Sequence, residues 1–292
     1  MASQQDIKRR IQSVRNTRKI TKALELVSAS KLRRAQLRIE ALRPYADRMR
    51  DLMMEAASHA KLHGQPLLTR REAKRVGIIV LTADRGLAGA FNGQVVRRAL
   101  QLGAEHAAQG REVVYLPVGR KGLGTLRFRG REVLTSWTGF SDRPEYGDAE
   151  AIVDAAVKAY SADELDLVLL VYNGFVSALS QTVEDSELLP IPEGEVAELD
   201  EQERAREGEL LFEPEAGEML TELLISSLEV TIYRALLEST ASEHGARMTA
   251  MRNASENAND LINAYTLAMN RARQAEITQE ILEVVAGADA LQ

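Results

Sequence analysis

The 292-residue sequence contains no cysteine, four histidines and only 4% aromatic residues. Without cysteine the chain cannot form a disulfide framework, a Cys-based zinc site or a thiol nucleophile, and a reducing compartment fits best. None of the histidines has the paired spacing that is typical of a metal site. We therefore expect neither a bound metal nor a cofactor.

The sequence also shows neither the features of a secretory leader nor those of a membrane span. Residues 1–6 lack an apolar core and are followed by basic residues, unlike a secretory signal. The longest uncharged run, 167–183, includes Asn173 and Ser177 and is typical of two strands and a turn rather than a membrane helix. We expect a soluble protein.

Motifs for catalysis are scarce. Residues 82–92 form a glycine-containing turn that in principle cradles a phosphate, but they match neither a P-loop nor the dinucleotide fingerprint. The glycines of 119–124 are expected to lie in an exposed loop beside Arg120. We interpret Asp84 with Arg85 as a structural ion pair or helix cap, since no nucleophile elbow, Ser/His/Asp trio or paired acid motif stands out. This scarcity favours a mechanical or scaffolding role over an enzyme.

Charge is divided unevenly along the chain, whose formal net charge is -6. Residues 1–50 contain 14 Lys and Arg against 4 acids, whereas residues 193–222 contain 12 acids against 2 Arg. Basic stretches attract acidic partners, whether protein, nucleic acid or membrane, although a solvated helix face explains such a stretch about equally well.

Residues 1–62 are predicted to form one long helix with a heptad seam. Its apolar seam positions are Ile7, Ile11, Val14, Leu32, Ala35, Ile39, Leu42, Ala46, Met49, Met53, Ala56 and Ala60. Pro44 interrupts the pattern and predicts a local kink or loosening.

The middle of that seam is polar. Its polar positions are Arg18, Thr21, Glu25 and Ser28. Over the same stretch the apolar residues shift to Ile20, Leu24 and Val27, so the apolar stripe changes phase. This change predicts that a partner other than the paired helix contacts the stretch.

Residues 215–292 are predicted to form a second long helix. Its seam positions are Met251, Ala254, Ala258, Leu261, Tyr265, Ala268, Ala272, Ala275, Gln279, Leu282 and Ala286. At ~1.5 Å per residue the two helices would be about 90 and 115 Å long, too long for the inside of a compact domain. We therefore expect them to pair with each other, antiparallel, outside it.

The segment 70–192 alternates between strands and helices. Strands are predicted at 76–81, 112–118, 166–172 and 178–184, and helices at 92–109 and 149–160. This alternation is typical of a small, mostly parallel α/β (Rossmann-like) domain. The expected fold is thus α/β plus a long antiparallel α-helical coiled coil, with an acidic linker or foot at 193–214.

Four stretches resemble one family. They are 20–32 (ITKALELVSASKL), 84–92 (DRGLAGAFN), 247–251 (RMTAM) and 270–281 (NRARQAEITQEI). In order and over nearly the whole chain, they resemble the γ subunits of F-type ATP synthases. The resemblance implies a non-catalytic central rotor shaft that couples rotation of the c-ring to conformational changes at the catalytic β subunits. The implied partners are the α and β subunits, the ε subunit and the c-ring, with membrane contact only through the complex.

The resemblance also implies contact residues. Those expected to contact β are Leu24, Lys31, Arg33, Arg34, Arg273, Gln274, Thr278 and Glu280, and those expected at the foot near the c-ring are Leu210 and Phe212. Family members often carry Cys where Ala88 stands. Because this chain has no cysteine there or elsewhere, thiol regulation is not expected. The implied location is peripheral, on the cytoplasmic face of a bacterial membrane.

Two other functions compete with this interpretation. The basic N-terminal helix is compatible with a coiled-coil nucleic-acid-binding protein, but its charges lie all around the helix without interleaved aromatic residues. A small α/β nucleotide enzyme with helical arms is the second alternative. We expect no binding of nucleic acid.

Overall fold

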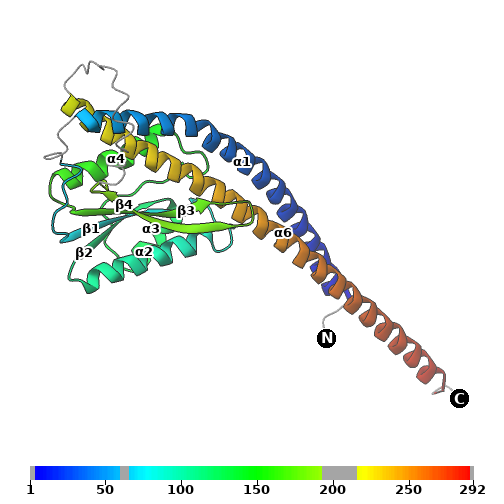
Figure 1. Ribbon diagram of the computed structural model, residues 1–292. Coiled ribbons are helices and arrows are strands. Elements are labelled where there is room, and N and C mark those ends of the chain that lie inside the picture. The colour runs from blue at the N-terminus through cyan, green and yellow to red at the C-terminus, as the bar shows by residue number, and fades with distance from the viewer. Residues whose placement is uncertain (1–3, 60–65, 193–215, 290–292) are drawn as a thin grey trace. The chain divides into compact units, whose positions relative to one another are not determined.

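The computed structural model describes residues 4–59, 66–192 and 216–289. Two helices dominate it (Figure 1): α1, Gln4–His59, and α6, Ala216–Asp289. The chain divides into two compact units, of which unit 1 comprises residues 1–29 and 247–292 and unit 2 comprises residues 30–246. Each long helix therefore contributes to both units.

Unit 2 contains a four-stranded sheet in the order β2-β1-β3-β4. Its strands are β1, Arg75–Leu81; β2, Glu112–Val118; β3, Leu167–Phe175; and β4, Gln181–Leu189. The first three are parallel, and β4 runs antiparallel to β3. The predicted mostly parallel α/β domain is confirmed.

Helices cover both faces of this sheet (Figure 1). They are α2, Phe91–Ala108; α3, Arg120–Phe128; and α4, Tyr146–Ser161. Alternate residues of β1 point to opposite faces, so Ile78 packs with Val95 and Ala99 of α2, whereas Ile79 packs with Ile152 of α4. The capping box of Glu145 and Asp148 fixes the start of α4.

The long helices do not stay outside the domain, contrary to expectation. Met53 of α1 belongs to the same apolar core as the β1 and α4 side chains. Residues of α6 also belong to it: Leu220, Leu224, Leu228, Ile232, Ala235 and Leu236. Because one sheet face is wide and apolar, α6 serves there as part of a packed layer rather than as a free arm.

Two predictions for the α/β domain were wrong in detail. Residues 120–128 form helix α3, not an exposed loop, because the glycines of that segment break the apolar pattern without preventing helix formation. The last strand covers Gln181–Leu189 instead of 178–184. Most of its residues are polar, so the sequence gives no apolar pattern for the part that continues the antiparallel pairing with β3.

Helix α1 continues through Pro44, which therefore does not end it. Beside this proline the predicted seam positions Ile39, Leu42 and Ala46 are only half-buried. They line a cavity of about 210 Å³ together with Arg234 and Glu238 of α6. Packing between the two helices is thus loose at this level of unit 2.

Unit 1 is an antiparallel helix pair, as predicted. Residue 18 of α1 contacts residue 259 of α6, residue 21 contacts residue 255, and residue 25 contacts residue 252. Near the start of α1, Ile7 and Ile11 pack against Ile262, with Tyr265 and Met269 beside them.

The predicted seam of α6 was wrong at Leu261 and at most positions beyond it, although Tyr265 and Ala272 do pack beside Ile262. Leu261 is 47% exposed and Ile262 is buried in its place. A straight α-helix has 3.6 residues per turn, so a strict heptad count drifts off the contact face. The expected seam residues Gln279, Leu282 and Ala286 are all exposed, since the described part of α1 begins at Gln4 and the last contacts in the described pair involve residues around 269–272.

Candidate functional site

The carboxyl ends of the parallel strands are where a doubly wound sheet ordinarily binds a ligand. Here Thr82, which follows β1, donates its hydroxyl hydrogen to the carbonyl oxygen of Val118 (2.8 Å) and accepts from the amide of Gly122 (2.9 Å). Gly119 has a φ of 93°, and a Cβ added there would lie 2.1 Å from the carbonyl oxygen of Thr82. The end of β1 is thus closed against the start of α3.

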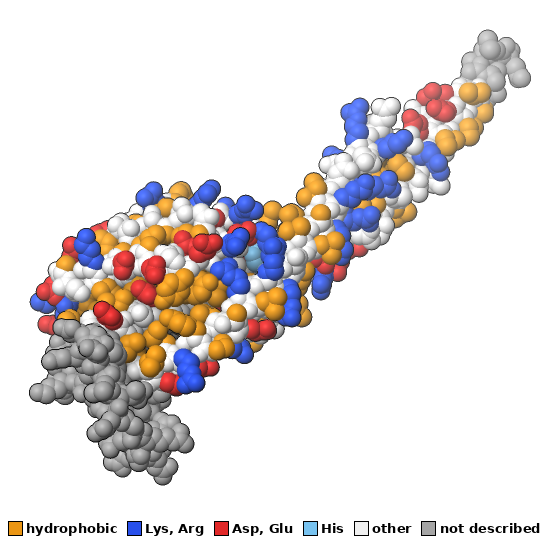
Figure 2. Space-filling model, turned by 90° about the horizontal axis from the view of Figure 1, so that it is seen from above, with side chains coloured by type: hydrophobic (Ala, Val, Ile, Leu, Met, Phe, Trp, Pro, Cys, Tyr) orange, Lys and Arg blue, Asp and Glu red, His pale blue; other side chains and the backbone are white. Residues whose placement is uncertain are grey.

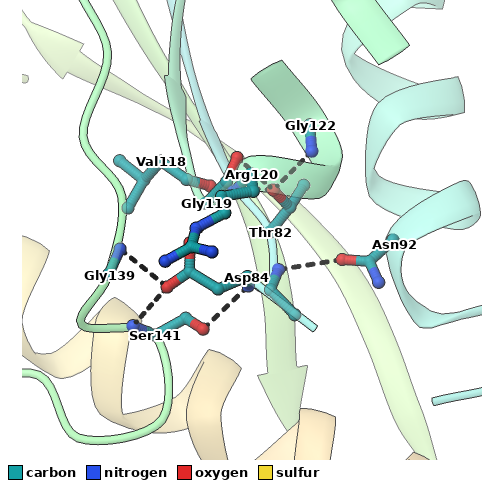
Figure 3. A network of polar contacts seen from close by, with 10 residues as sticks. Thr82, Asp84, Asn92, Val118, Gly119, Arg120, Gly122, Gly139 and Ser141 are labelled. Atoms are coloured by element: carbon teal, nitrogen blue, oxygen red, sulfur yellow. Dashed lines mark hydrogen bonds and ion pairs between the residues drawn. The ribbon is translucent and has the colours of Figure 1, made fainter. Parts of the chain in front are cut away.

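Asp84 occupies the amino terminus of α3 (Figure 3). Its carboxylate accepts hydrogen bonds from the amides of Arg120 (3.1 Å), Gly139 (2.8 Å) and Ser141 (3.2 Å). The Arg120 guanidinium lies 3.7 Å away. The structural interpretation of Asp84 is confirmed, but its ionic partner is Arg120 rather than the exposed Arg85. A carboxylate of the chain itself therefore takes the position that an anion would occupy.

Helix α6 fills the crevice between the ends of β1 and β3. Ser242 donates to the carbonyl oxygen of Gly174 (3.1 Å), and a Cβ on Gly245 would lie 3.1 Å from the carbonyl oxygen of Ala178. On the β1 side, Ala246 packs against the buried Phe91. Helix α6 thus occupies the place where this kind of sheet holds a nucleotide. The carboxyl ends of the strands bind α6 instead of a ligand.

The seam of unit 1 remains polar at its middle. Thr21 and Ser255 share a hydroxyl hydrogen bond of 2.6 Å, and Arg18 donates to Asn259 at 2.6 Å. Glu25, 6% exposed, pairs with both Lys22 (2.9 Å) and Arg252 (3.2 Å). The hydrogen bond from Lys22 outweighs the effect of burial and, with Arg252, holds the pKa of Glu25 below its ordinary value.

Apolar side chains face outward over the same stretch. Ile20 is 61% exposed and Val27 is 51% exposed, and Leu24 between them is half-buried. The seam therefore keeps its phase with polar residues, and the shifted residues 20, 24 and 27 form a stripe, here called the outer stripe, directed away from α6. Figure 2 shows apolar and basic side chains interspersed along the helical pair.

The predicted β-contact residues divide into two groups. Arg33, Arg34, Arg273, Gln274, Thr278 and Glu280 are exposed. Lys31 is partly buried and donates to Asp142 at 2.7 Å, so its charge is already neutralised within unit 2. The foot residues Leu210 and Phe212 lie outside the described residues.

One cluster was missed at the sequence level. Asp142, in the loop before α4, meets Lys31 of α1 and His244 of α6, which are 111 and 102 positions away along the chain. A lone acid in a loop carries no periodic signal, so only the folded chain brings the three residues together. Within the described ranges, no three acidic or histidine side chains are grouped as metal ligands. No helix in those ranges has the length and apolarity needed to span a bilayer.

Comparisons with known proteins give a consistent result. A protein-family model described as ATP synthase matches residues 3–291. The ATP synthase gamma chain of Pelotomaculum thermopropionicum is 46% identical over 292 residues, covering 100% of both chains. That of Rubrobacter xylanophilus is 44% identical and covers 100% of this chain and 99% of its own length.

Solved structures agree with the sequence relatives. A chain in the central stalk and c-ring of Tetrahymena thermophila mitochondrial ATP synthase is 30% identical, with a TM-score of 0.62 over 81% of this chain and 99% of that chain. A chain in the Euglena gracilis mitochondrial ATP synthase structure of OSCP, F1 and c-ring shares the fold, with a TM-score of 0.66 at 17% identity over 99% of this chain and 94% of that one.

Proposed function

This chain belongs to the ATP synthase γ chain family, and we propose that it acts on the catalytic β subunits through the outer stripe and the exposed basic and polar residues of its two long helices. It is a non-catalytic subunit, the central rotor shaft that couples c-ring rotation to conformational changes at β. Its partners are the α and β subunits, the ε subunit and the c-ring. The nucleic-acid alternative receives no support from the relatives.

The observation that carries the proposed contacts is the outer stripe. Ile20 and Val27 expose apolar surface on a helix whose paired face is polar. An apolar stripe left in water is stabilised by a partner that covers it, at about 25 cal/mol per Å² of apolar area. A β subunit that packs on Leu24 and its neighbours would supply that cover.

The shaft can act on its ring only if it presents different side chains to the different β subunits. A rod with equal affinity for all conformations of its ring shifts no equilibrium, and driving one site from 1:99 to 99:1 requires about 5.5 kcal/mol of differential interaction. The outer stripe, the exposed Arg33 and Arg34, and the exposed segment around Arg273 lie on different parts of the chain. At any angle of the shaft, three chemically identical β subunits would meet different side chains.

The terminal part of α6 suits a sliding contact. From Arg273 to Ala286 every side chain is exposed, and Ile277, Ile281, Leu282 and Val284 are among them. Apolar contacts are non-directional, so they permit rotation, whereas well-aligned ion pairs would resist it. Arg273, Gln274, Thr278 and Glu280 would provide the polar contacts with β.

The location follows from the complex. The chain is part of the F1 sector, the peripheral part of a membrane-bound ATP synthase. We place it at the cytoplasmic face of a bacterial membrane, an assignment supported by its identity to bacterial relatives.

The double variant Arg273→Ala, Gln274→Ala tests the β contact. In vesicles containing the complete complex, we expect proton-driven ATP synthesis to fall about tenfold, the effect of losing one charged and one polar contact, while the complex still assembles. Lys158→Ala, an exposed lysine of α4, is the matched control and should leave the rate unchanged. An unchanged rate in the double variant would remove these residues from the coupling surface.

Reversal of charge at Arg33 and Arg34 to Glu tests the basic face. Association with the catalytic hexamer should weaken, and the difference from the wild type should shrink as salt rises, because exposed charges are screened over about 10 Å at 0.1 M. A loss of binding that does not depend on salt would indicate misfolding instead of a lost electrostatic contact.

A further inference from the structure

Helix α6 is surrounded over one stretch of unit 2. Every residue from 235 to 245 is buried. A helix that packs on one side buries only one stripe, so burial all round requires neighbours on every side. Thr240 donates to the carbonyl oxygen of Ser141 (2.9 Å) in the loop before α4, and Ser242 donates to that of Gly174 (3.1 Å) near the end of β3.

One side chain of the domain connects to both long helices at this level. Asp142 accepts a hydrogen bond from the Lys31 ammonium group of α1 at 2.7 Å, and the same ammonium also contacts its second oxygen. The imidazole Nε2 of His244 on α6 lies 3.4 Å from the Asp142 carboxylate. His244 is 1% exposed, so it cannot move away without displacing the helix. We call Asp142, Lys31 and His244 the clasp.

The clasp is electrostatically consistent. Burial alone would raise the pKa of Asp142, but the hydrogen bond and charge of Lys31, together with His244 and Arg85, hold that pKa below its ordinary value. The carboxylate is therefore ionised at neutral pH. An ionised acceptor makes shorter and stronger hydrogen bonds than a neutral one, and these restrict the relative movement of the groups that share it.

We propose that Asp142 is a positioning residue that fixes α1 and α6 together to the α/β domain, so that rotation applied to the domain turns both helices at once. This inference rests on the proposed rotor function. Apart from the clasp, α1 meets the domain through Met53 in the core and through Arg38, which donates to the carbonyl oxygen of Pro144. Between these two contacts the seam of α1 with α6 is half-buried and adjoins the cavity of about 210 Å³ around Ile39 and Leu42. The clasp adds a charged connection beside a second cavity, of about 490 Å³, that is lined by Lys31 of α1, Asp142 of the domain and Thr240 of α6.

The test uses the complete ATP synthase complex in vesicles, with ATP hydrolysis and ATP-driven proton uptake measured on the same sample. For Asp142→Asn we expect hydrolysis close to the wild-type rate and proton uptake per ATP lower by about threefold, a size suited to a partly exposed ion pair. Asp154→Asn, an exposed aspartate of α4, is the matched control and should leave the ratio unchanged. Asp142→Glu, which keeps the charge, should recover part of it. A ratio equal to the wild type in Asp142→Asn would overturn the proposal.

A second variant separates positioning from general stability. The chain has no cysteine, so Lys31→Cys with Asp142→Cys can be bridged by a short thiol-specific cross-linker. We expect the bridged complex to pump more protons per ATP than the same complex before bridging. No change on bridging would contradict the clasp. If the wild-type complex itself fails to pump, the rotor function fails, whereas normal pumping in both wild type and Asp142→Asn removes only the clasp.

Discussion

Helix α6 passes through two different environments, and the contrast between the two units explains how one chain serves as both a holder and a shaft. In unit 2, residues 235–245 are enclosed on all sides. Among the described residues that α6 contributes to unit 1, only Arg247, Met251, Ala258 and Ile262 are buried, and every side chain from 273 to 286 is exposed. In unit 2 the helix is part of the core, whereas in unit 1 most of its surface is exposed.

The seams differ in the same way. The core of unit 2 is built from aliphatic side chains such as Leu224 and Ile232, both fully buried. The middle of the unit 1 seam consists of hydrogen-bonded polar side chains, while apolar residues 20 and 27 face outward. A polar seam contributes less to stability than an apolar one but leaves the apolar surface available for partners.

The largest loss of stability should come from truncating a buried side chain of α6 in unit 2. Leu224→Ala should cost about 3 kcal/mol of unfolding free energy, because a fully buried leucine leaves a cavity. Leu261→Ala on the same helix in unit 1, where the side chain is 47% exposed, should change it by less than about 0.5 kcal/mol. Denaturant unfolding of the two variants measures the difference, and equal losses would remove the contrast between the units.

The next effect concerns the closed edge of the sheet. Gly119→Ala should destabilise unit 2 by about 2–3 kcal/mol, since the new Cβ would lie 2.1 Å from the carbonyl oxygen of Thr82 in addition to the strain of a positive φ. Gly130→Ala, with a φ of 65° and nothing within 4 Å, should cost only about 1–2 kcal/mol of backbone strain. Thermal unfolding of the pair checks this order, and a reversed order would mean that the edge is not tightly closed.

A smaller effect is expected in the polar seam of unit 1. Thr21→Val should cost about 0.5–1 kcal/mol, because the Ser255 hydroxyl loses its partner. The double variant Thr21→Val, Ser255→Ala should recover most of that loss, since both polar groups are then removed.

Amide hydrogen exchange of α1 reports this local stability without requiring the whole chain to unfold. Thr17→Val, at an exposed position of the same helix, serves as the control. If the double variant is less stable than Thr21→Val alone, the loss in Thr21→Val does not come from leaving the Ser255 hydroxyl without its partner.

The smallest effect concerns Glu25 and pH. Its folded pKa lies below the ordinary value of 4.5, so the stabilisation that it contributes is present above that value and is lost as the pH falls through the lowered pKa. Because Lys22 and Arg252 are largely exposed, the contribution should be below about 1 kcal/mol. Glu25→Gln should thus be less stable than wild type at pH 7, and the two should converge as the pH falls from 4.5 through the lowered folded pKa of Glu25. A gap that persists in acid would assign the effect to packing instead.

The sequence predicted elements with a clear period and missed those without one. The predicted strand 112–118 has the bounds of β2, and the strand 76–81 differs from β1 by one residue, because short apolar runs bounded by turns define a buried strand. Helix α3 was missed because its glycines resemble a loop. The error at Leu261 arose from counting heptads along a helix that follows 3.6 residues per turn.

The candidate site was predictable only in part. Exposure of Arg273 and Gln274 fits a contact surface, and the outer stripe was visible as a change of phase. That α6 fills the ligand crevice of the sheet was not predictable, because Ser242 and Gly174 are 68 positions apart and neither carries a periodic signal. Long-range packing of this kind depends on the whole fold and not on a local pattern.

Direct observation of rotation tests the central claim, that this chain rotates within the ring of catalytic subunits. Phe128 is 92% exposed and the chain has no cysteine, so Phe128→Cys gives a single attachment point for an optical probe on unit 2. With the catalytic hexamer fixed to a surface and ATP supplied, we predict one-directional rotation of the probe in steps of one third of a turn. ATP hydrolysis by the assembled complex without rotation of the probe would contradict the account.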